Sequence, residues 1–181
     1  PLFNKKILMT HILRYIIFSI FFFFNYSSHA DTIFVNANVD GGLQNGTTWE
    51  NAFSDLQDAL ALAEHGDEIW VAQGTYYPTI ESDREISFII PEGVALYGGF
   101  VGTETILEER NWEANPSILS GDIGIHEDSL DNSFTVVYIH IMEDDSTRLL
   151  NGLSIVGGNA NIFNNSPPQF ERKKCGGGIY I

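Results

Sequence analysis

Basic residues and cysteine are scarce in this chain. Lys and Arg total 9 against 24 Asp and Glu over 181 residues, which gives a formal net charge of −15. A surface of this sign repels phosphate backbones and anionic lipid head groups, so binding to nucleic acid or to a membrane surface is not expected. The single cysteine, Cys175, excludes an internal disulfide and any metal site built from cysteines. Hydrophobic residues make up 44%, which is too apolar a composition for intrinsic disorder.

The N-terminal segment 1–30 has the layout of a secretory signal peptide. Arg14 precedes an apolar stretch at 15–24, and the segment closes on Ser28-His29-Ala30, which has small residues at its first and last positions. This stretch is shorter than the roughly 20 apolar residues that cross a bilayer, although an uncleaved N-terminal anchor is the alternative. We therefore predict that the segment 1–30 is removed. Three bases go with it, so the segment 31–181 carries 24 acids and 6 bases, a net charge of −18.

One segment has the pattern of an amphipathic helix. We predict a helix over Ser54–Glu64, whose first residue forms a capping-box pattern with Gln57. Leu56 and Leu60 recur on one face, and acidic residues lie off that face. Gly66 is the expected left-handed residue that ends the helix.

The rest of the chain consists of short β-branched and aromatic runs separated by turn formers, which is typical of strands. The predicted strands are Asp31–Asn38, Ile69–Ala72, Ile86–Ile90, Val94–Tyr97, Ile118–Ser120, Thr135–Ile141, Leu149–Val156 and Ile179–Ile181. Several end in Gly or Gly-Gly, and their central residues recur every 18–25 residues. Such a period, without helices between the strands or tight hairpins, favours a solenoid. We predict an all-β solenoid built as a parallel β-helix, with a β-sandwich as the alternative.

Four sequence strings carry a resemblance to a known group of proteins. They are TTWENAFSDLQDALALAEHGDEIWVAQGTYYP, VALYGGFVGTET, NWEANPSILSGD and LNGLSIVGGNA. Together they resemble the N-terminal part of secreted bacterial right-handed parallel β-helix proteins of pectate-lyase-like architecture, in particular surface proteins of the polymorphic outer-membrane type. The resemblance covers about residues 31–181 and implies that the Ser54–Glu64 helix caps the first coil. It departs at Leu150-Asn151-Gly152, where an Asp is expected before the Gly.

No catalytic or cofactor-binding residue is predicted. Enzymes of the resembled architecture use an Arg or Lys base, or several Asp, on neighbouring coils. Asp122 follows a predicted strand but lacks the second carboxylate that glycoside hydrolysis requires, so we assign it to a turn. The six bases of the mature chain are expected in loops or at strand edges; they are Arg84, Arg110, Arg148, Arg172, Lys173 and Lys174.

Two acidic clusters supply oxygens of the kind that calcium prefers. They are Glu127/Asp128/Asp131 and Glu143/Asp144/Asp145, and neither has the Asp-x-Asp-x-Asp-Gly loop of a specific calcium site. Solvated turns are therefore the favoured interpretation, and calcium is the one cofactor left open.

Several aromatic side chains can stack on sugars. They are Trp112, Tyr76, Tyr77 and Phe170, although packing of loops against the sheets is the favoured role for all four. His140 is predicted to point outward from its strand, because it alternates with apolar residues.

Two functions follow from these observations. The first is a non-catalytic, secreted or surface-displayed module at the cell surface or outer membrane, which serves as a stalk or adhesin-like protein toward carbohydrate or host-surface ligands. The alternative is the N-terminal part of a polysaccharide lyase or glycoside hydrolase whose catalytic coils follow residue 181. Ile179 and Ile181 fall on one face and no cap follows them, so the β-helix domain at 31–181 is expected to continue and its open end to associate.

Overall fold

The structure is a computed structural model that describes residues 30–140, 147–161 and 177–181. Within these ranges the chain is mostly β-strand, with one α-helix and a short 3-10 helix at Leu107–Glu109, so the fold is all-β as predicted. The predicted signal peptide up to residue 29 lies outside the described residues. So do the second acidic cluster, Phe170, Cys175 and the bases at 172–174.

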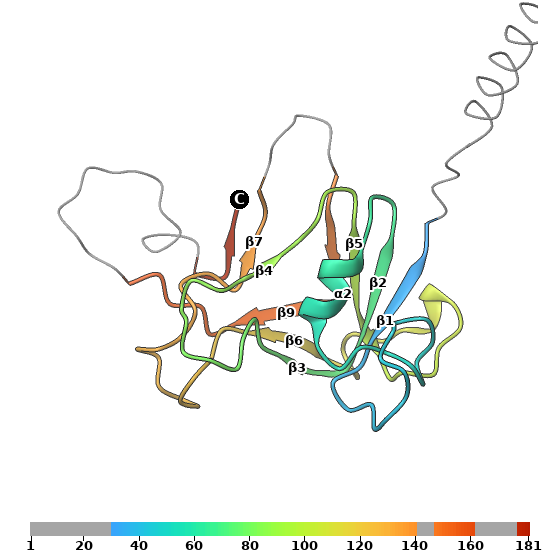
Figure 1. Cartoon of the computed structure of the whole chain (residues 1–181), viewed down its shortest axis with the longest axis horizontal. Coiled ribbons are helices and arrows are strands. Elements are labelled where there is room, and N and C mark those ends of the chain that lie inside the picture. Colours follow the sequence, from blue (N-terminus) through green and yellow to red (C-terminus); the bar gives the residue numbers. More distant parts are fainter. Residues whose placement is uncertain (1–29, 141–146, 162–176) are drawn as a thin grey trace, which may run out of the picture.

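The strands form three sheets in which every ladder is parallel (Figure 1). The first sheet joins β1 (Thr32–Val35), β2 (Glu68–Ala72), β5 (Ala95–Phe100) and β8 (Leu149–Asn151). The second joins β4 (Phe88–Ile89), β7 (Val137–Tyr138) and β10 (Ile179–Tyr180), and the third joins β3 (Gly74–Tyr76), β6 (Ser117–Ser120) and β9 (Leu153–Val156). From β2 onward the chain visits the first, third and second sheets in the same cycle three times.

The spacing between paired strands differs from the predicted period. In the first sheet Ile33 pairs with Ile69, Ile69 with Leu96, and Leu96 with Leu150. Each of these separations along the chain is longer than the predicted period, and that between Leu96 and Leu150 is the longest. The predicted period assumed that consecutive apolar runs in the sequence are neighbouring strands of one sheet. In the structure a run is usually followed by a corner, and the next run joins a different sheet.

Glycine makes one of these corners where the sequence predicted a continuous strand. The run Leu149–Val156 divides at Gly152 into β8 and β9, which belong to the first and third sheets. Gly152 has φ +72°, and a Cβ there would lie 2.8 Å from the carbonyl oxygen of Gly98. Only glycine tolerates this backbone conformation with so close an approach. β3 was not predicted, because the chain that forms β2 passes into the third sheet at Gly74.

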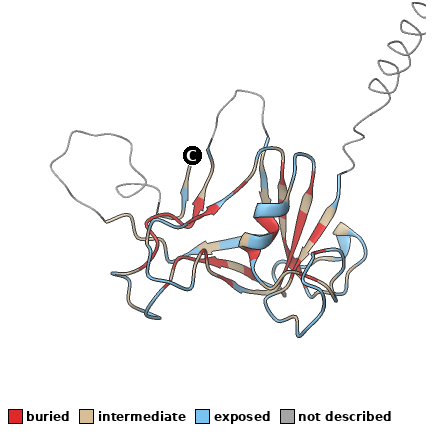
Figure 2. Ribbon diagram, viewed as in Figure 1, coloured by how far each residue is buried: buried red, intermediate tan, exposed pale blue. Residues whose placement is uncertain are grey.

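Apolar side chains from all three sheets and from the helix share one core. Figure 2 shows buried residues along the strands and on the helix, and most of them belong to this core. Residues from paired strands lie in register within it, as Ile69 and Leu96 do. The core also contains Phe88 from β4, Leu119 from β6 and Val137 from β7, all fully buried. The inward-facing side chains of one strand therefore pack against the inward-facing side chains of the neighbouring strand in the same sheet.

The predicted helix is present but shorter, as α2 (Leu56–Leu62), and Leu56 and Leu60 are buried as predicted. It contacts β1, β2 and β4, which lie at the N-terminal end of the first and second sheets. The predicted cap was wrong: Asp55 is the N-cap, and its Oδ1 accepts the N–H of Gln57 at 2.9 Å. A carboxylate suits this position because it faces the positive end of the helix.

The end of the helix also differs from the prediction. Ala63 is the C-cap and has an extended backbone, so the helix stops before it reaches Gly66. Gly66 has φ +100° and lies in the turn that leads into β2.

Candidate functional site

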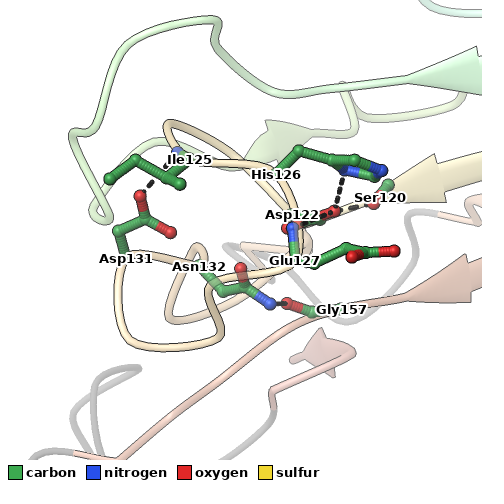
Figure 3. Close-up of polar contacts among 8 residues, drawn as sticks. All are labelled: Ser120, Asp122, Ile125, His126, Glu127, Asp131, Asn132 and Gly157. Atoms are coloured by element: carbon green, nitrogen blue, oxygen red, sulfur yellow. Dashed lines mark hydrogen bonds and ion pairs between the residues drawn. The ribbon is translucent and has the colours of Figure 1, made fainter.

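The loop 121–133, between β6 and β7, is rich in ionisable side chains (Figure 3). It holds four carboxylates, Asp122, Glu127, Asp128 and Asp131, and one imidazole, His126. We call this segment the acidic loop. It follows β6 directly, so the third sheet fixes its starting point.

Asp122 fastens the first half of the acidic loop. Its backbone N–H donates to Ser120 Oγ at 3.2 Å, and its carboxylate oxygens accept the N–H of Glu127 at 3.0 and 3.3 Å. His126 Nδ1 lies 2.5 Å from Asp122 Oδ2. Glu127 has φ +67°, a left-handed conformation that costs a non-glycine residue energy and that these contacts hold in place. Asp122 therefore closes a turn, as the sequence analysis expected.

The pair formed by Asp122 and His126 borders an open depression of about 290 Å³, with Tyr77 on its rim. An imidazole beside a carboxylate can accept a proton during catalysis. Glycoside hydrolysis needs two carboxyl groups that face each other across the scissile bond. Of the described residues lining this depression, Asp122 is the one acid.

The second half of the acidic loop contains oxygen atoms that have no hydrogen-bond partner. Asp131 Oδ2 accepts the N–H of Ile125 at 2.7 Å, whereas its Oδ1 is buried and unpaired. The amide nitrogen of Asn132 donates to the carbonyl of Gly157 at 2.7 Å, and its Oδ1 is likewise buried and unpaired. The Ser133 hydroxyl adds a third such oxygen. Most buried polar groups in proteins are paired, so three consecutive exceptions require an explanation.

The predicted cluster Glu127/Asp128/Asp131 does not meet around one point. Asp128 Oδ1 accepts the N–H of Leu130 at 2.9 Å, and Figure 3 shows the Glu127 side chain directed away from Asp131. Within the part of the chain that the structure describes, no three His, Cys, Asp or Glu side chains are grouped so as to hold a metal ion.

The three arginines in the described part of the chain are held by backbone carbonyls. Arg84 donates to the carbonyls of Asn132 and Asn159 at 2.6 and 2.9 Å, so it ties two loops together. Arg110 and Arg148 each donate to a backbone carbonyl as well, at 3.1 and 3.2 Å. Arg84 and Arg110 lie in loops and Arg148 lies at the edge of β8, as predicted. Their hydrogen bonds favour a structural role over that of a catalytic base.

The aromatic candidates have different environments. Tyr76 is a buried core residue of β3, and its hydroxyl donates to the carbonyl of Ala72 at 2.9 Å, so it packs within the core rather than, as predicted, between a loop and a sheet. Burial raises the pKa of Tyr76 to about 12, against a smaller lowering by the hydrogen bond from the N–H of Ala37. Trp112 is 53% exposed, with the guanidinium of Arg110 5.1 Å from its ring.

An aromatic cluster on the first sheet was missed by the sequence analysis. Phe34 and Trp70 are register partners on β1 and β2, and Trp70 stacks on Phe100 with ring centroids 4.7 Å apart. Trp49 joins them from the loop after β1, and its indole N–H donates to the carbonyl of Glu104 at 2.8 Å. The sequence did contain a signal for this cluster, because Phe34 and Trp70 each lie between two inward-facing residues of their strands and therefore face the other side of the sheet.

Glu104 holds a turn that packs beside this cluster. Its carboxylate accepts the N–H groups of Val101, Gly102 and Thr103 at 2.6–2.9 Å. Burial alone would raise the pKa of Glu104, but these hydrogen bonds outweigh it and lower the pKa below its ordinary value. His140 is exposed, as predicted, but it follows β7 instead of lying within a strand, and its ring centroid lies 5.9 Å from that of Tyr138.

Comparison with protein-family models, with curated proteins and with solved structures finds no match to this chain. None of the helices in the described residues has the length and apolar character needed to cross a bilayer.

Proposed function

We propose that this chain is a secreted or cell-surface module built as a right-handed parallel β-helix, with a non-catalytic stalk or adhesin-like role. The observation that carries this proposal is the repeated cycle of the chain through three parallel sheets. If each coil contributes one strand to each sheet, every strand pairs with the third strand after it. The pairs β2–β5–β8, β3–β6–β9 and β4–β7–β10 follow this rule. Right-handedness follows from the preference of parallel crossover connections.

The position of α2 supports the same architecture. A solenoid must cover the apolar layer and the unpaired backbone groups at its ends. Leu56 and Leu60 of α2 are buried against the strands at the N-terminal end, as expected of a cap on the first coil. The pectate-lyase-like resemblance of the sequence agrees with this placement.

A display role is favoured over catalysis by the environment of the ionisable groups. The three arginines in the described residues are bonded to carbonyls, and the depression beside His126 has one lining carboxylate. The net charge of −18, from 24 acids and 6 bases over the segment 31–181, repels uronate polymers, so neutral carbohydrates or host-surface proteins are the better ligand classes. A polysaccharide lyase or glycoside hydrolase is the alternative that an assay must separate.

Export is tested by expressing the chain with its own N-terminus in a bacterial host. We expect the mature product to begin at Asp31 in N-terminal sequencing and to be exposed to protease on intact cells or found in the medium. A product that retains the apolar stretch at 15–24, or that stays inside the cell, would contradict the proposal.

Absence of catalysis is tested on pectin, alginate and neutral polysaccharides, with and without calcium. We expect no new reducing ends and no unsaturated products. Release of product that Asp122→Asn abolishes and Asp128→Asn leaves intact would favour the enzyme instead. Both substitutions remove one charge from the acidic loop, so the comparison isolates the carboxylate paired with His126.

A further inference from the structure

We propose that the acidic loop binds a calcium ion through the unpaired oxygens of Asp131 and Asn132. Figure 3 shows the side chains of Asp131 and Asn132 next to each other on the acidic loop, and one oxygen of each is buried without a hydrogen-bond partner. This inference does not depend on the proposed display function, because it concerns the loop alone.

The orientation of Asn132 is the first argument. Its amide nitrogen donates to the carbonyl of Gly157, so the amide cannot be turned over without losing that hydrogen bond. The other atom of the amide, Oδ1, is buried and unpaired, and Asn132 as a whole is only 7% exposed. Leaving a buried acceptor unpaired is unfavourable, and a bound cation removes that cost. The guanidinium of Arg84 donates a hydrogen bond to the backbone carbonyl of Asn132 and not to its side chain. The side-chain oxygen Oδ1 therefore stays without a partner.

Charge is the second argument. Asp131 Oδ1 is a carboxylate oxygen that is buried and unpaired beside Asn132. A buried anionic oxygen without a partner is costlier than a neutral one, and a cation is its natural counterpart. Asp122, Glu127 and Asp128 lie in the same loop, and with Asp131 they outnumber the two nearby basic groups, His126 and the Arg84 guanidinium on the Asn132 carbonyl, so the surrounding field attracts cations.

The chemistry of the two oxygens selects the ion. A carboxylate and an amide oxygen are hard ligands, which suit calcium and exclude the soft metals that prefer sulfur or imidazole. Calcium also accepts irregular geometry and completes its coordination with water. With few protein ligands, we expect a dissociation constant on the order of 0.1–1 mM, as in extracellular modules.

A thermal titration of the purified protein tests the site. Calcium chloride at about tenfold excess over the dissociation constant should raise the melting temperature by about 3–5 °C. Magnesium chloride and sodium chloride at equal ionic strength are the controls, and neither should match the rise. An equal effect of all three salts, or no effect of calcium, would mean that charge screening or a trapped water accounts for these oxygens.

Two matched variants locate the effect. Asp131→Asn removes the proposed anionic ligand but keeps an oxygen that can accept the N–H of Ile125. Asp128→Asn removes the same charge from the same loop but not a proposed ligand. We expect the calcium-dependent rise to be lost in Asp131→Asn and retained in Asp128→Asn. Equal loss or equal retention in both variants would overturn the proposal.

Nuclear magnetic resonance of the unaltered protein makes the test independent of variant folding. Calcium should shift the backbone amide signals of the segment 122–133 and of Gly157, and leave those of α2 unchanged. Saturation at one ion per chain, measured by equilibrium dialysis, is the expected stoichiometry. Shifts spread over other acidic turns, or none in the acidic loop, would refute the site.

Discussion

Replacing Leu56 with alanine removes a side chain that is fully buried where α2 meets the N-terminal strands. The change deletes apolar atoms from the core and leaves a cavity that the surrounding strands only partly fill. Leu→Ala substitutions of this kind cost about 2–5 kcal/mol, and because Leu56 is completely buried we expect a loss of about 3 kcal/mol. For a folded unit of about 150 residues, that loss lowers the melting temperature by about 6–12 °C.

Leu62 offers a matched control on the same helix. It is 55% exposed, so its truncation removes less apolar contact, and alanine has a slightly better helix propensity. We expect Leu62→Ala to change the free energy of unfolding by less than about 1 kcal/mol. Any effect on helix formation itself is shared by both variants, so their difference reports the packing of the helix on the core.

Urea-induced unfolding followed by tryptophan fluorescence and far-ultraviolet circular dichroism measures both variants. With a slope of about 2 kcal/mol per molar urea, Leu56→Ala should lower the midpoint by about 1.5 M. The slope itself should not change, since the substitution alters stability rather than compactness. A difference between Leu56→Ala and Leu62→Ala of less than about 0.5 kcal/mol, the range of ordinary surface substitutions, would mean that α2 does not cover the core.

Three further substitutions test other parts of the structure. Leu60→Asp places an unpaired charge where the side chain is 5% exposed, and the expected loss of several kcal/mol should abolish the cooperative thermal transition seen by calorimetry. Glu104→Gln should lower the free energy of unfolding at pH 7. The pKa of Glu104 is lowered on folding, so the advantage of the unaltered protein is fully present above pH 4.5. It should decline as pH falls through the folded pKa, which urea titrations at successively lower pH from pH 7 measure. Gly99→Ala should lower the free energy of unfolding by about 2–5 kcal/mol in chemical denaturation, because Gly99 has φ +99° and a Cβ there would lie 2.7 Å from the backbone nitrogen of Trp112. Gly41 has φ +85° but open space around it, so Gly41→Ala should cost only about 1–2 kcal/mol. Equal losses in the two variants would refute the steric explanation.

Local patterns in the sequence were sufficient for the all-β class and for the helix. Alternation of apolar residues in short runs predicted strands, because side chains of a strand alternate between its two faces. Leu56 and Leu60 were assigned to the buried face of the helix on their spacing alone, and both are buried. The precise cap was not predictable, since Ser54 and Asp55 are both good N-cap residues and the tertiary contact of Ser54 with Gln44 separates them.

The pairing of strands was decided by the tertiary structure. Partners in the first sheet are distant in the sequence, as Leu96 and Leu150 are, so no local pattern records which runs become neighbours. Gly152 turns one apparent strand into two because of its left-handed backbone and the nearby carbonyl of Gly98. The unpaired oxygens of Asp131 and Asn132 arise in the same way, since the carbonyl of Gly157 that orients the Asn132 amide comes from the segment after β9. Composition and periodicity describe each segment by itself, whereas these features depend on which segments the folded backbone brings together.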